Sequence, residues 1–227
     1  MTNLEPYFLI KLLHILLFVY WLGGDIGVFY SAIHVRKHEL TIPARQTALK
    51  ILAWVDQIPR FCLVFMLPVG YSLAAQLGVV RASPVALLAT WLVAFAWAAM
   101  VASIHHYQGT ARGQRLRNID LVWRCLLVGG LLWDAWQGFM GSGHVLARWV
   151  AAKLIVFALL ITCGIMIRLR GTKLGPALRQ LFENGSTPQI EAAIKLSFAR
   201  TRPFVLSIWV LLVVAAYIGI AKPAFGV

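Results

Sequence analysis

Three side chains that can ionise or bind a metal lie inside long apolar stretches: His14, Asp134 and Lys153. At about 1.5 Å of rise per helical residue, each lies roughly 8–10 Å from one end of its stretch. Charged groups inside a membrane are costly and usually serve a function. We therefore expect the three at one level of a helix bundle, with Asp134 and Lys153 facing each other as catalytic residues. Alternatively, Lys153 extends its ammonium to the headgroups and Asp134 borders a water-filled cavity.

His14 is the best candidate for a cofactor ligand. Neutral imidazole is a common metal ligand and the usual axial ligand of haem iron. The same stretch contains Trp21, Gly23 and Gly24, and small residues allow a helix or a flat ligand to approach closely. We predict that His14 binds the iron of a b-type haem, with His144 as a candidate second ligand. A helix-to-helix hydrogen bond from His14 is the alternative.

Further ionisable residues lie toward the opposite ends of these stretches. Asp25 is at a similar level to Arg60 and Arg124, which predicts an ion pair, with proton or substrate handling as the alternative. Four histidines also fall on this side, where side chains commonly contact headgroups and solvent: His34, His38, His105 and His106. Binding a transition metal or a second haem is the alternative role for such a group, but no cysteine or carboxylate has a metal-ligand spacing beside them.

The composition identifies the solvent that these residues face. The chain has 227 residues, of which 60% are hydrophobic and 13% charged, against roughly 25% charged in soluble domains. A helix needs about 20 apolar residues to cross a bilayer. Six stretches qualify: 7–30, 61–80, 84–105, 121–140, 147–167 and 203–221. The sequence therefore predicts an all-α bundle of about six transmembrane helices, forming one domain over residues 1–227.

The basic residues predict the orientation of this bundle. The net charge is +13, but these residues are grouped in short loops, as expected for membrane topology and not for nucleic-acid binding. Sixteen lysines and arginines fall on one side of the six stretches and five on the other. Both termini are then expected outside a bacterial inner membrane. Because Glu5 precedes the first stretch, we expect a retained helix and not a cleaved signal peptide. Thr41 and Thr187 mark the starts of two further helices, expected along the membrane surface.

Two segments carry a resemblance to a known family. In the first, Lys11 precedes His14 by three residues, and Trp21 and Gly23 follow; in the second, Trp149 precedes Lys153. Both segments resemble the haem-binding membrane protoporphyrinogen oxidases of the HemJ type, and residues 56–68 are similar to the start of that family's second helix. The first helix is also similar to that of the copper-resistance membrane proteins of the CopD type. The HemJ type has four helices, so this chain has two additional ones.

The resemblance implies a set of roles. His14 would be a haem ligand, Lys153 a site lysine, and Arg60 a basic residue near the porphyrin carboxylates. Porphyrin and quinone would be partners beside the lipid bilayer, and a homo-oligomer is compatible with the sequence. We therefore expect a haem b oxidoreductase or electron-transfer protein. The alternatives are a transporter of ions, protons or copper, and a membrane anchor or assembly protein without a catalytic site.

Overall fold

The computed structural model describes residues 4 to 224, and this part of the chain is helical apart from short connections. The helices are α1 Leu4–Val35, α2 Ile42–Val55, α3 Gln57–Gln76, α4 Pro84–His106, α5 Ala111–Phe139, α6 Arg148–Arg170, α7 Leu174–Asn184 and α8 Pro188–Ala221. An isolated bridge between Val80 and Val145 is the only β pairing in the described residues. The predicted all-α class is confirmed.

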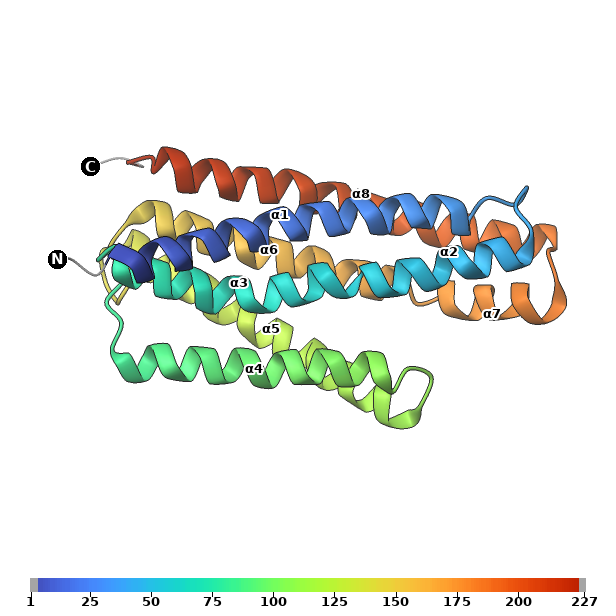
Figure 1. The fold of residues 1–227 in the computed structure, drawn as a ribbon, viewed down its shortest axis with the longest axis horizontal. Coiled ribbons are helices and arrows are strands. Elements are labelled where there is room, and N and C mark those ends of the chain that lie inside the picture. The colour runs from blue at the N-terminus through green and yellow to red at the C-terminus, as the bar shows by residue number, and fades with distance from the viewer. Residues whose placement is uncertain (1–3, 225–227) are drawn as a thin grey trace.

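The long helices run roughly antiparallel along one axis (Figure 1). Helix α6 packs between α5 and α8, whereas α1 packs against α2 and α3, and α4 joins α3 to α5. The start of α1 and the end of α8 lie at the same end of the bundle, on the left of Figure 1. We call this the termini end, and the other the opposite end.

Five helical stretches in the described residues are long and apolar enough to cross a membrane. They are Pro6–Val35, Ile42–Gln76, Pro84–His106, Arg148–Arg170 and Pro188–Ala221. Helix α5, which contains the expected stretch 121–140, is not among them. Its apolar half carries Arg124 and Asp134, which lower the hydropathy of that stretch. Even so, α5 runs the length of the bundle between α4 and α6 (Figure 1).

The two extra helix starts are confirmed, but the helices that they begin do not form separate surface elements. Thr41 precedes α2, and Thr187 caps α8 by accepting a hydrogen bond from the Ile190 amide. Helix α2 continues in line into α3 (Figure 1). Helix α8 runs unbroken through Pro203, which was expected to begin a helix. A proline inside a membrane helix is tolerated where neighbouring groups satisfy the freed backbone carbonyl.

The core lies between the helices, while the outer surface is apolar as well. Val64, Trp97 and Ile161 are buried in the largest cluster. Large side chains that face outward are exposed on most helices, among them Val85 on α4 and Ile220 on α8. Contiguous exposed apolar surface of this extent is unusual for a soluble monomer. The protein is therefore an integral membrane protein.

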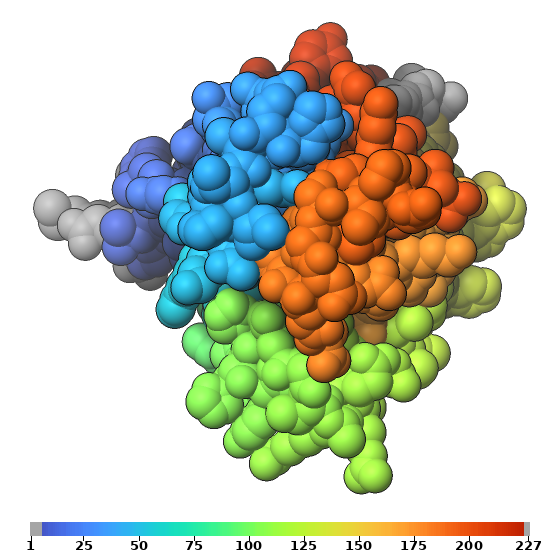
Figure 2. All heavy atoms as spheres, turned by 90° about the vertical axis from the view of Figure 1, so that its right-hand side faces the viewer, coloured from blue at the N-terminus to red at the C-terminus, as the bar shows by residue number. Residues whose placement is uncertain are grey.

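The opposite end holds a second, smaller core. Here α7 is an amphipathic helix that packs Leu178 and Leu181 against Val35 of α1 and Ile194 of α8. Figure 2 looks onto this end, where α2 in blue lies beside α7 and the start of α8 in orange. This core fixes the loops at the opposite end.

Candidate functional site

His14 lies on α1 against a glycine of α3. The nearest approach is to Gly70, where a β-carbon would stand 3.3 Å from Cε1 and 3.8 Å from Nδ1 of the imidazole. Nδ1 is buried and has no hydrogen-bond partner in the described residues. A buried polar atom without a partner is rare because it loses its hydrogen bonds to water. His14 is therefore an imidazole with a buried ring nitrogen whose hydrogen-bonding capacity no described group satisfies.

Lys153 is the charged neighbour of His14. It lies on α6, is half-buried, and interacts electrostatically with the imidazole. Its Nζ is 2.9 Å from the position that a β-carbon at Gly219 of α8 would take. The glycine therefore leaves room for the ammonium between α6 and α8. The electrostatic interaction with His14 relates α1 to α6 and α8, and the common level of His14 and Lys153 stays a prediction.

Asp134 does not face Lys153 in the described structure. Its carboxylate lies 3.7 Å from Nε2 of His144, and both side chains are more than a third exposed. The His144 ring also meets the ring of Tyr71 edge to face, with 6.2 Å between centroids. Loop geometry explains this partner, because Gly141 and Gly143 have positive φ and turn the chain back toward α5.

The loop that carries His144 is held by backbone hydrogen bonds. The Arg81 amide donates to the His144 carbonyl at 2.8 Å, and the Leu146 amide donates to Val79 at 2.9 Å. His144 contacts Tyr71, which follows Gly70 on α3, so its side chain projects about 100° around the helix from the side on which Gly70 meets His14. The structure thus associates His14 and His144 with successive residues of α3, on different faces of that helix.

The expected ion pair of Asp25 with Arg60 or Arg124 is not formed. Nε of Arg60 donates to Asp56 at 2.7 Å, and Nε of Arg124 donates to Asp120 at 2.9 Å. Each arginine thus binds a carboxylate four residues earlier on the chain, where helical geometry brings side chains together. The Oδ2 atom of Asp25 is buried and has no hydrogen-bond partner in the described residues.

Asp120 is a buried acceptor that sequence reasoning missed. Besides Arg124, it accepts from Nε1 of Trp97 on α4 at 2.9 Å and from Nη1 of Arg168 on α6 at 3.4 Å. One carboxylate therefore joins α4, α5 and α6. The spacing of four residues between Asp120 and Arg124 could have predicted this ion pair from the sequence.

A second missed pair closes the opposite end. Arg45 is 1% exposed and forms two hydrogen bonds to Glu191, at 2.6 and 3.0 Å. Its Nε also donates to the Val35 carbonyl at 2.8 Å, and Ser186 donates to Glu191. The partners are 146 residues apart in sequence, so no local pattern indicated the pair.

The four histidines of the opposite end do not assemble into a metal site. His34 bonds the Tyr30 carbonyl at 3.1 Å, and His105 packs against Trp54 with ring centroids 5.4 Å apart. No group of three or more metal-binding side chains occurs in the described part of the chain. Metal binding by this set is therefore unsupported.

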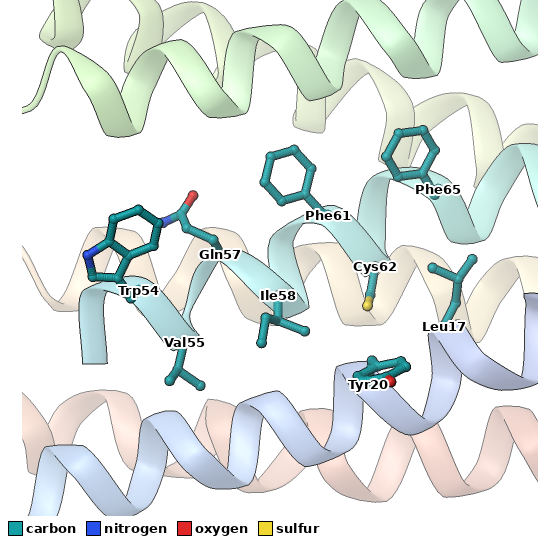
Figure 3. Close-up of a pocket in the computed structure, with 9 residues that line it drawn as sticks. All are labelled: Leu17, Tyr20, Trp54, Val55, Gln57, Ile58, Phe61, Cys62 and Phe65. Carbon is teal, nitrogen blue, oxygen red and sulfur yellow. The ribbon is translucent and has the colours of Figure 1, made fainter. Parts of the chain in front are cut away.

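An apolar groove of about 580 Å³ lies between α1 and the α2–α3 pair (Figure 3). Tyr20, Trp54, Phe61 and Phe65 provide aromatic surface, and Leu17 closes the end nearest His14. Leu17 is three residues after His14, so the two side chains share a face of α1. The groove thus begins about one helical turn from the imidazole and suits a flat, apolar molecule.

No family model, curated protein or solved structure matches this chain.

Proposed function

We propose that the protein is a b-type haem protein of a bacterial inner membrane, acting in oxidoreductase or electron-transfer chemistry. The observation that carries this proposal is the His14 imidazole beside Gly70, whose buried Nδ1 has no hydrogen-bond partner in the part of the chain that the structure describes. Neutral imidazole is the usual protein ligand of haem iron. The donor set fits haem with His14 as a ligand. Because His144 is held beside Asp134 and Tyr71, we do not propose it as the second haem ligand.

We further propose six membrane-spanning helices, with α5 as the sixth and both termini outside. The sixteen-to-five division of basic residues supports this orientation, as does the common end shared by the start of α1 and the end of α8. In a bilayer, the two charges in the apolar half of α5 are offset by local partners. Arg124 bonds Asp120, and Asp134 lies beside His144.

Each remaining residue of the site has a defined task in this proposal. A bound haem would supply one-electron chemistry. Lys153 puts a positive charge near His14, which favours an anionic group there. The aromatic groove gives a lipophilic porphyrin or quinone a path from the lipid to the region of His14. Arg60 is paired with Asp56 and lies ten residues before Gly70 on α3, about 15 Å along the helix from the contact with His14, so we assign it no contact with the porphyrin.

A protoporphyrinogen-oxidase-like reaction is the specific form of this proposal, and it rests on the resemblance of the Lys11–His14 and Trp149–Lys153 segments. Asp25 favours a second candidate, the transport of protons or other ions. Its Oδ2 is buried without a hydrogen bond in the described residues, and such intramembrane carboxylates serve as proton carriers. A membrane anchor or assembly protein would need neither the buried carboxylate of Asp25 nor the ionisable side chains of His14 and Lys153.

The experiment is an absorption spectrum of the purified protein in its air-oxidised and dithionite-reduced states. We expect a Soret band and a reduced α band that are lost in His14→Ala and kept in His105→Ala, a control that removes a histidine far from the site. Lys153→Met should keep the bands but change the reduction midpoint. A wild-type protein without bands, or bands unchanged in His14→Ala, would overturn the proposal.

A further inference from the structure

Two arginines share the carboxylate of Asp120 between α5 and α6, and two further arginines lie near enough to interact with this group electrostatically. Arg124 is buried and Arg168 is half-buried, and both bond Asp120. Arg60 of α3 interacts electrostatically with Asp120, and Arg117 with Arg168. Arg117 and Arg124 are seven residues apart, which places them on one face of α5. We call these side chains, together with Asp56, the arginine cluster.

The arginine cluster contains more positive than negative charge. Its guanidinium groups number four, whereas Asp56 and Asp120 are the only carboxylates with which they pair in the described residues. Asp56 balances Arg60 and Arg117 is exposed, whereas Arg124 and Arg168 share the single carboxylate of Asp120. One positive charge of this pair therefore has no carboxylate partner in the described residues, and an anion that neutralises it would stabilise the arrangement.

The cluster also has free donors and an open side. Arg168 contributes one bond at 3.4 Å to Asp120, and its other N–H groups have no partner in the described residues. The Arg168 and Arg60 side chains are 28% and 44% exposed, whereas Asp120 beneath them is 8% exposed. Arg124 is held by its contact with the Trp97 ring, 5.4 Å from the centroid. Planar guanidinium groups bind phosphate through paired hydrogen bonds.

We propose that the arginine cluster binds the phosphodiester of an anionic phospholipid headgroup. The cluster lies among α3, α5 and α6, and the Arg60 and Arg168 side chains are partly exposed, so a headgroup can reach their guanidinium groups from outside the bundle. Basic pockets between helices on the cytoplasmic side bind anionic lipid headgroups. A zwitterionic lipid would bring its own cation and leave the excess charge of Arg124 and Arg168 unbalanced. This inference does not depend on haem.

The test compares thermal unfolding of the purified protein in nanodiscs of phosphatidylglycerol and of phosphatidylcholine, followed by tryptophan fluorescence. We expect phosphatidylglycerol to raise the Tm of the wild type by about 2–4 °C. Arg168→Gln should lose at least roughly half of that rise. Arg170→Gln removes the same charge from an exposed position two residues later on α6, and it should keep the rise. Each variant is compared with its own phosphatidylcholine value, which separates lipid binding from a loss of stability.

Further measurements distinguish a lipid phosphodiester from free phosphate as the bound anion. If Arg168→Gln does not fold, Arg168→Lys keeps the charge but removes the planar donor set, and we expect it to reduce the rise. Inorganic phosphate added to phosphatidylcholine nanodiscs should not reproduce the rise. A rise with inorganic phosphate would assign the cluster to a free anion and overturn the lipid. An equal response of the position-168 variants and Arg170→Gln, or no rise in the wild type, would overturn the site.

Discussion

The imidazole of His14 on α1 lies against the backbone of Gly70 on α3, at the position where any other residue would have a side chain. A β-carbon at position 70 would stand 3.3 Å from Cε1 of His14, closer than ordinary packing allows. The contact fixes the ring between two helices, and it leaves Nδ1 buried and unpartnered in the described structure. The proposed binding of haem by His14 depends on this relationship.

Gly70→Val should therefore displace His14. Overpacking at a close helix contact costs about 1–3 kcal/mol, so we expect a lower thermal midpoint in detergent together with weaker haem binding. Gly23→Val is the matched control, since a β-carbon at Gly23 has no atom within 4 Å. Equal losses of thermal stability in the two variants would argue against the contact.

Removing Arg45 should destabilise the opposite end. Arg45→Met leaves Glu191 beside the buried core without its partner, and breaking a buried pair costs about 3–5 kcal/mol. Chemical denaturation of the purified protein measures this loss. Arg179→Met removes an exposed partner of Glu183, and its unfolding midpoint should equal that of the wild type. If Arg45→Met also matched the wild type, the pair would have no structural role.

Neutralising two carboxylates inside the bundle, those of Asp120 and Asp25, should affect the thermal midpoint differently. Asp120→Asn leaves Arg124 and Arg168 without their counter-charge, so its thermal midpoint should fall. Asp25→Asn removes a charge for which the described structure provides no hydrogen bond at Oδ2, so its midpoint should stay the same or rise. Thermal unfolding of both variants at one pH provides the comparison. A larger loss in Asp25→Asn would reveal a partner for Asp25.

The proposed topology can be tested by cysteine labelling in intact cells. In a background lacking Cys62, Cys125 and Cys163, an impermeant maleimide should label Ser142→Cys, in the α5–α6 loop, without permeabilisation. Thr172→Cys, between α6 and α7, should be labelled only after the membrane is opened. Both positions are exposed. Labelling of both cysteines from outside would contradict a membrane crossing by α6.

The spanning helices could be predicted because length and hydropathy are local properties of the chain. The stretch expected at 84–105 matches α4, and that expected at 147–167 matches α6 to within three residues. Helix ends in polar segments were harder to predict, because the apolar pattern fades before the helix ends. For this reason the apolar pattern predicted a helix that begins at Pro203, whereas α8 begins at Pro188 and continues through Pro203. Only the Thr187 cap indicated this earlier start.

The partners of charged residues were mostly unpredictable, since pairing depends on how helices and loops meet. The level of Asp134 pointed to Lys153, but the turn through Gly141 and Gly143 brings His144 to it first. Arg124 was an exception, because its partner four residues earlier could be inferred from helical spacing. The association of His14 with Lys153 followed from depth alone, since both lie about equally far from one end of their helices.

The most direct test of the central claim is the haem content of protein purified from cells supplied with a haem precursor. Pyridine haemochrome quantification should give close to one haem b per chain in the wild type and in His105→Ala, and very little in His14→Ala. Circular dichroism of each sample checks that the helices are retained. A folded wild-type protein without haem, or a folded His14→Ala variant with the wild-type haem content, would contradict the account.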